Sequence, residues 1–145
     1  MINDISADLD TTVKGVQTAI TLFLLIMMDS PAFPKATIEV HSPQPGAVLV
    51  QLAGEHDLYS GEEFRQSLEQ SLARCDHLIV DLSAAEFIDS TIVAVLIQTK
   101  RSAAELDRKF NVVLGRAPAV ERILEVAGVI PLLGVVPTVE QALAA

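Results

Sequence analysis

Apolar and polar residues alternate along residues 36–145 in two patterns, one typical of strands and one typical of helices. Short runs rich in Val, Ile and Leu predict strands at 37–41, 47–53, 77–82, 110–114 and 132–136. Apolar residues that recur every three or four positions predict helices that begin near residues 60, 90, 118 and 138. Strands that alternate with helices after an opening hairpin indicate the α/β class. We therefore expect a single α/β domain with a mostly parallel or mixed sheet of about five strands and four helices.

Local signals mark where the predicted helices begin and end. Ser60 and Glu63 have the spacing of a capping box, and Thr138 repeats this signature before the last helix. Pro118 stands where a first helical turn tolerates proline, and Gly128 stands where helices commonly end. These residues predict bounds for three of the helices.

The middle of the chain combines a predicted buried strand with a predicted buried helix. Residues 78–80, Leu-Ile-Val, form an unbroken apolar run, which is typical of a parallel strand covered on both faces. Residues 83–88 then read as a six-residue connector, and the next helix, at about 90–107, is wholly apolar from 92 to 97. Functional residues of such sheets gather where strands end and helices begin, so this junction is the candidate site.

Asp89, Ser90 and Thr91 stand at the predicted amino end of that buried helix. The first amides of a helix lack internal partners, so we expect a phosphate on Ser90 to meet free N–H donors. A phosphoserine carries about −1.5 to −2 charges at neutral pH, and beside Glu86 and Asp89 it would create a strongly anionic patch that expels a docked partner. The same residue types are also ordinary N-caps, and on their own they favour a plain cap.

The residues around this junction resemble the STAS family of anti-sigma factor antagonists. The family signature is a strand that ends in Asp-Leu-Ser, a short loop with Phe, and then Ile/Met-Asp-Ser-Ser/Thr-Gly entering a helix. Residues 81–83, 87–88 and 89–91 match it. Residues 54–58, Gly-Glu-His-Asp-Leu, also look like the family's Gly-Glu-Leu-Asp-Leu strand end. The order of the predicted elements agrees with the family from about Ala36 onward.

The resemblance implies a function and a set of site residues. It implies binding to an anti-sigma factor that is also a serine kinase, which frees a sigma factor and regulates transcription by partner switching. Ser90 matches the serine that the kinase phosphorylates, and a phosphatase of the PP2C type would reverse the modification. Asp89 matches the neighbouring aspartate that positions this site. The residues expected to contact the partner are Asp57, Glu86, Phe87, Asp89, Ser90 and Thr91.

Ile92 departs from the family pattern, which usually has glycine at this position. A glycine lets another backbone approach closely, so we expect the branched side chain of Ile92 to occupy part of that space. Two alternatives therefore remain: a divergent kinase as the partner, or a STAS adaptor whose Ser90 is not phosphorylated, such as the small subunit of an ABC transporter for lipids. The same surface would then bind the transporter ATPase.

The composition narrows the classes of partner. The chain has 145 residues and a formal net charge of −9, with 10 Lys and Arg against 19 Asp and Glu. This charge repels phosphate backbones and anionic lipid headgroups, so no nucleic-acid partner is expected and a membrane is disfavoured. Cys75 has no second cysteine to pair with, which suits a reducing compartment, and we expect a cytoplasmic protein.

Residues 1–35 stand apart from the domain predicted at 36–145. The run from Ala19 to Met28 is nearly all apolar, but it is too short for a spanning helix. The charged residues before it are three Asp against one Lys, whereas a secretory signal would be basic there, so export is also disfavoured. Two interpretations of 1–35 remain: an appended helix that docks on the domain or on a partner, or a stretch upstream of the native start.

An enzyme is the weaker hypothesis. Asp81, Glu86 and Asp89 lie near one predicted strand end and could in principle hold a magnesium ion. The chain nevertheless has no Gly-rich phosphate loop, no Gly-x-Ser-x-Gly elbow and no His-Glu-x-x-His helix. Its three histidines fall in separate segments and are expected on the surface or at strand ends. We expect a binding protein without a catalytic group, a bound metal or a cofactor.

Overall fold

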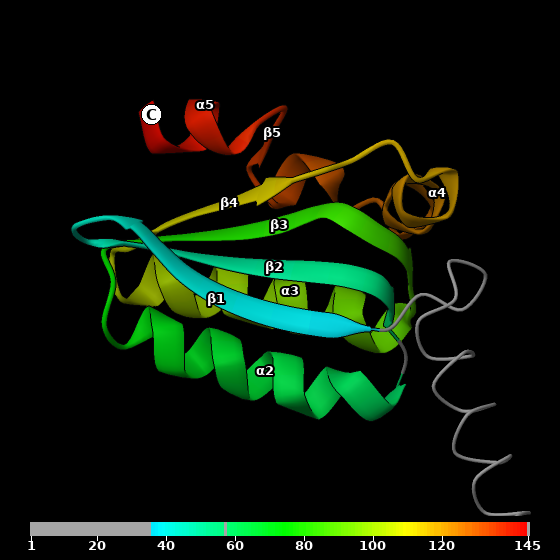
Figure 1. Ribbon diagram of the computed structural model, residues 1–145, viewed down its shortest axis with the longest axis horizontal. Coiled ribbons are helices and arrows are strands. Elements are labelled where there is room, and N and C mark those ends of the chain that lie inside the picture. Colours follow the sequence, from blue (N-terminus) through cyan, green and yellow to red (C-terminus); the bar gives the residue numbers. More distant parts are fainter. Residues whose placement is uncertain (1–35, 57, 145) are drawn as a thin grey trace, which may run out of the picture. The chain divides into compact units, whose positions relative to one another are not determined.

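Five strands lie side by side in one sheet in the computed structural model, which describes residues 36–56 and 58–144 (Figure 1). In chain order, which is also their order across the sheet, they are β1 (Thr37–Gln44), β2 (Ala47–His56), β3 (His77–Ile88), β4 (Lys109–Val113) and β5 (Val135–Val136). β1 is antiparallel to β2, and each later pair of neighbours is parallel. The expected mixed sheet of five strands is confirmed. Both interpretations of 1–35 concern residues outside this description, and the domain boundary after residue 35 stays a prediction.

In the part of the chain that the structure describes, four helices pack against the two faces of the sheet. They are α2 (Leu58–Leu72), α3 (Ser90–Glu105), α4 (Pro118–Ala127) and α5 (Val139–Ala144). α2 and α3 lie next to each other on one face, while α5 packs on the opposite face (Figure 1). α4 packs against β3. Among the described residues, no helix is both long and apolar enough to cross a membrane.

The main core fills the space between the sheet and the pair α2 and α3. Its members with no exposed surface include Val50, Leu52, Phe64, Leu68, Leu78, Val80, Leu96 and Val112. Ile79 points to the other face, where it packs with Ala142 of α5. The predicted burial of residues 78–80 on both faces is therefore confirmed. Burial of each such side chain contributes about 1.5–3 kcal/mol to the free energy of unfolding, and this stabilises the packing of the helices on the sheet.

Several predicted helix ends are confirmed. Pro118 occupies the first turn of α4, and Gly128 ends that helix in the left-handed conformation at φ +68°. The amide of Gln141 donates to the hydroxyl oxygen of Thr138 at 3.1 Å, so Thr138 does cap α5. Each of these signals depends only on residues within about one turn, which is why the sequence is enough to place them.

The capping box predicted for Ser60 and Glu63 is wrong, because α2 already begins at Leu58. The Ser60 hydroxyl lies 3.1 Å from the Nδ1 atom of His56, which is buried at the end of β2. The hydroxyl that the sequence spacing assigns to a cap therefore lies against the His56 ring.

Two strands differ from their predicted lengths. β3 continues through residues 83–88, where a connector was predicted, because this segment pairs in parallel with the end of β2 up to His56 and Ile88. Register shifts within this pairing disturb the alternation by which a strand is recognised in sequence. β5 is shorter than the predicted run at 132–136, because a 3-10 helix (Ile130–Leu132) comes first.

Gly115 marks a close backbone contact between the end of β4 and β3. A Cβ atom on Gly115 would lie 2.5 Å from the carbonyl oxygen of Ser83 and 2.6 Å from its Cα atom. We expect Gly115→Ala to lower the free energy of unfolding by about 1–3 kcal/mol, because backbone atoms must move apart. The control is Ser102→Ala on the exposed side of α3, expected to change stability by less than about 0.5 kcal/mol. Urea unfolding measures both, and equal midpoints would contradict the contact.

Candidate functional site

The junction between β3 and α3 lies at the carboxyl ends of two neighbouring parallel strands. The register pairs Glu55 with Phe87 and His56 with Ile88. Beyond the last pair, the amide of Asp89 donates to the carbonyl oxygen of His56 at 3.2 Å. The end of β2 therefore holds the residue that precedes α3.

Asp89 is the N-cap of α3. Its backbone is extended, and its Oδ1 atom accepts the amides of Thr91 at 3.0 Å and Ile92 at 3.2 Å. The expectation that a phosphate on Ser90 would meet free amides is therefore wrong for these two donors, because the Asp89 carboxylate already occupies them. The capping role that the residues alone favour is confirmed.

Ile92 does not project from the surface as the sequence suggested. Its side chain has no exposed surface and belongs to the main core, whereas Ser90 is exposed. Residues two apart on a helix point roughly 200° away from each other, so an outward Ser90 requires an inward Ile92. The expectation that Ile92 occupies docking space is wrong, because its side chain packs into the core.

The structure brings most of the predicted partner-binding residues together. Glu86 and Phe87 are exposed at the end of β3, with Phe87 41% exposed, and Thr91 is half-buried in the first turn of α3. Asp57 lies outside the described residues. The roles of these side chains in partner binding stay predictions.

Asp81 is not part of the exposed surface around Ser90. It is buried, and its carboxylate accepts from the side-chain amide of Gln51 at 3.1 Å and from the backbone amide of Ser83 at 2.8 Å. These bonds hold the irregular part of β3. Within residues 36–56 and 58–144, no group of three His, Cys, Asp or Glu side chains is arranged to hold a metal ion.

Sequence reasoning missed three residues of the junction. Gly61, in the first turn of α2, faces Thr91 so closely that a Cβ atom would lie 2.7 Å from the Thr91 methyl carbon. A glycine inside a helix is unfavourable, and that was the available signal of a close approach. Glu55 is exposed beside Phe87, and His56 is completely buried behind it. Only the pairing of β2 with β3 reveals their place.

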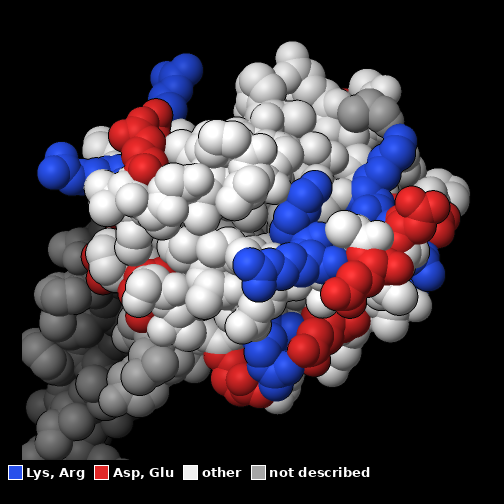
Figure 2. Space-filling model, turned by 180° about the vertical axis from the view of Figure 1, so that it is seen from behind, with Lys and Arg blue, Asp and Glu red and all other residues white. Residues whose placement is uncertain are grey.

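The exposed part of the first half of α3 is uncharged. Residues 90–99 contain no Lys, Arg, Asp or Glu, and the exposed ones among them are Ser90, Ala94 and Gln98. Figure 2, which views the molecule from behind, shows Lys and Arg interleaved with Asp and Glu toward one side and a broad area without charged side chains beside them. Charge added at Ser90 would thus enter an uncharged stretch of helix, next to Glu86 and Asp89.

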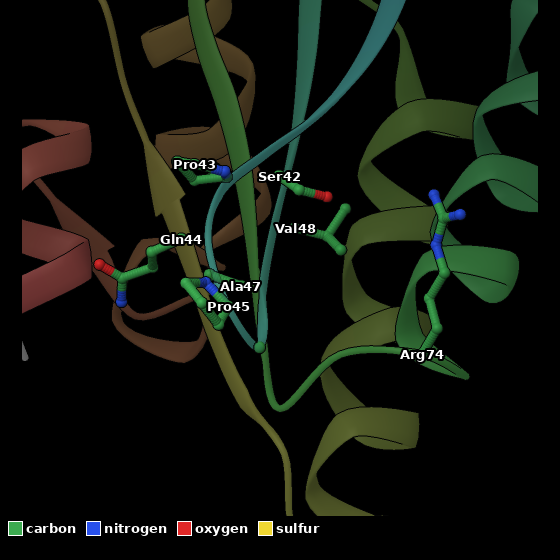
Figure 3. Close-up of a pocket in the computed structure, with 8 residues that line it drawn as sticks. Ser42, Pro43, Gln44, Pro45, Ala47, Val48 and Arg74 are labelled. Atoms are coloured by element: carbon green, nitrogen blue, oxygen red, sulfur yellow. The ribbon is translucent and has the colours of Figure 1, made fainter.

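A hollow of about 510 Å³ lies at the other end of the strands, where the β1–β2 turn meets the end of α2 (Figure 3). It is lined by residues 42–48 and by Arg74. In Figure 3 the side chains of Ser42 and Val48 point toward the Arg74 side, while Gln44 points away. None of the predicted site residues lines this hollow, so it is not part of the junction.

Comparison with known proteins gives consistent results. The family model described as the STAS domain matches residues 40–142. An anti-sigma factor antagonist from Mycobacterium paratuberculosis is 27% identical, with a TM-score of 0.69 over 81% of this chain and 97% of that chain. The anti-sigma factor antagonist SpoIIAA in its unphosphorylated form is 19% identical, with a TM-score of 0.64 over 74% of this chain and 93% of that chain. Phosphorylated SpoIIAA from Bacillus is 18% identical, with a TM-score of 0.59 over 74% and 97% of the two chains. The SpoIIAA structures share the fold.

The cap can be separated from the charge of Asp89 by substitution. We expect Asp89→Ala to lower the free energy of unfolding by about 0.5–2 kcal/mol, because two α3 amides lose their acceptor. Asp89→Asn keeps a capping oxygen and should cost clearly less. Urea unfolding followed by circular dichroism measures both. Equal destabilisation by Asn and Ala would show that the cap is not what Asp89 contributes to stability.

Proposed function

Since the chain belongs to the STAS domain family, we propose that it is a cytoplasmic anti-sigma factor antagonist that acts by binding and not by catalysis. The observation that carries this proposal is the exposed Ser90 at the first position of α3, directly after the N-cap residue Asp89. The M. paratuberculosis antagonist, with 27% identity over 81% of this chain, supports the same reading.

The proposed partner is an anti-sigma factor of the serine-kinase type, which phosphorylates Ser90, with a PP2C-type phosphatase to reverse the modification. An exposed hydroxyl next to a rigid N-cap can enter a kinase active site without unfolding the domain. The inward direction of Ile92 supports this step, because no branched side chain stands beside Ser90 in place of the family glycine. SpoIIAA, which shares the fold, is described in both phosphorylated and unphosphorylated forms.

Charge is the proposed switch. A phosphate on Ser90 adds about −1.5 to −2 charges beside Asp89 and Glu86. The carboxylate of Asp89 already holds the Thr91 and Ile92 amides, so these two donors do not neutralise the phosphate. Among the described residues, Glu86 forms no ion pair either. The new charge therefore stays on the surface and acts on the partner.

Phe87 is the proposed apolar anchor of the complex. It is a large side chain left 41% exposed at the end of a central strand, with the exposed Glu55 next to it in the register. Aromatic side chains at the centre of an interface commonly carry much of the binding free energy. Phe87 and Ser90 together explain how one surface can bind a partner and release it.

The kinase step is tested by incubating the chain with the anti-sigma factor kinase of the source organism and labelled ATP. We expect the wild type to incorporate label and Ser90→Ala to incorporate none. Ser83→Ala is the matched control, because Ser83 is an exposed serine on β3, the strand that precedes α3. Label that persists in Ser90→Ala, or that disappears in Ser83→Ala, would contradict Ser90 as the acceptor.

The switch is tested by the affinity for the same anti-sigma factor. Phosphorylation of Ser90 should weaken binding by at least about tenfold, or about 1.4 kcal/mol, and Ser90→Glu should weaken it in the same direction. The loss should shrink at high salt, because the repulsion is screened. Ser102→Glu, at an exposed serine in the second half of α3, is the charge control and should leave the affinity unchanged. Equal affinity of all forms, or capture of a transporter ATPase in place of an anti-sigma factor, would overturn the proposal.

A further inference from the structure

His56 is a buried histidine with both ring nitrogens in use. Its side chain has no exposed surface. Nε2 lies 2.9 Å from the carbonyl oxygen of Ala53, and Nδ1 lies 3.1 Å from the hydroxyl of Ser60. A carbonyl oxygen can only accept, so Nε2 carries the hydrogen, and Nδ1 of the neutral ring accepts from the Ser60 hydroxyl. The surroundings therefore select one neutral tautomer.

The backbone of His56 continues this set of hydrogen bonds into the junction. Its carbonyl oxygen accepts the amide of Asp89 at 3.2 Å. The Asp89 carboxylate in turn accepts the amides of Thr91 and Ile92. A connected series of hydrogen bonds thus runs from Ser60 in the first turn of α2, through the end of β2, to the N-cap of α3.

A second contact joins the same two helix ends. Gly61 follows Ser60 and packs against the methyl group of Thr91, with no room for a Cβ atom between them. The first turns of α2 and α3 are therefore linked both by hydrogen bonds and by direct packing.

We propose that His56 is a positioning residue for the Ser90 site: its ring ties the first turn of α2 to the end of β2, whose carbonyl holds the N-cap that presents Ser90. An apolar side chain could fill the same space, but it would leave the Ala53 carbonyl and the Ser60 hydroxyl without these bonds. Losing these two hydrogen bonds weakens the link between the first turn of α2 and the end of β2 and so favours local opening. The inference deepens the proposed function and rests on it, since it concerns how Ser90 is offered to a kinase.

The experiment measures amide hydrogen exchange at Asp89, Thr91 and Ile92 in the full chain. His56→Leu and Ser60→Ala should speed exchange of these amides about tenfold relative to the core amides of β4. Ser60→Thr keeps the hydroxyl and should restore slow exchange. His77→Leu is the matched control, because His77 is also buried and hydrogen-bonded, to Asn111, but stands at the opposite end of β3. It should leave the three amides unchanged relative to the core.

Three results would overturn the inference. In the first, His77→Leu speeds exchange of the three amides as much as His56→Leu does. In the second, His56→Leu speeds exchange uniformly over the whole domain, and in the third, the imidazole ¹⁵N spectrum places the hydrogen of His56 on Nδ1. If His56→Leu does not fold, the pair Ser60→Ala and Ser60→Thr decides the question.

The kinase assay keeps this inference separate from the proposed function. A destabilised cap lowers the fraction of chains that offer Ser90 correctly, so His56→Leu should raise the KM for phosphorylation by the factor by which that fraction falls and leave kcat unchanged. A wild type that is never phosphorylated would overturn the proposed function. A phosphorylated wild type with the same KM in His56→Leu would overturn the role of His56 alone.

Discussion

The parallel pairing of β2 with β3 is the constraint on which the rest of the junction depends. It runs from Ala47 and His77 to His56 and Ile88, so both strands end at the same edge. The bond from the Asp89 amide to the His56 carbonyl extends this pairing by one step and sets where α3 begins. The position of Ser90 thus follows from a strand pair and not from a flexible loop.

A rigid junction has a consequence for a switch based on charge. The Asp89 carboxylate satisfies amides that would otherwise attract a phosphate, and it does so before any modification. A phosphate on Ser90 would then gain little by reorganising the helix end, and its charge would face outward. In the proposed switch the domain would change its surface potential while its core, including the buried Ile92, would stay as it is.

The same helix turn serves the core and the surface at once. Ile92 and Val93 face inward and anchor α3, while Ser90 and Ala94 face outward. A change of the family glycine to Ile92 therefore adds to the core and does not block the site. The effect of a departure from a family motif depends on which way the side chain points, which a motif alone does not state.

The sequence by itself determined the α/β class, the burial of the central strand, the bounds of α4 and the position of the junction, because periodicity and caps act over a few neighbouring residues. Only the tertiary structure decided the length of β3, the start of α2 and the direction of Ile92. β3 is extended by pairing with β2, which is distant in the chain. The Ser60 hydroxyl lies within hydrogen-bond distance of the buried His56 ring and does not form the predicted cap. Such choices depend on which groups the folded chain brings into contact, and no local pattern records them.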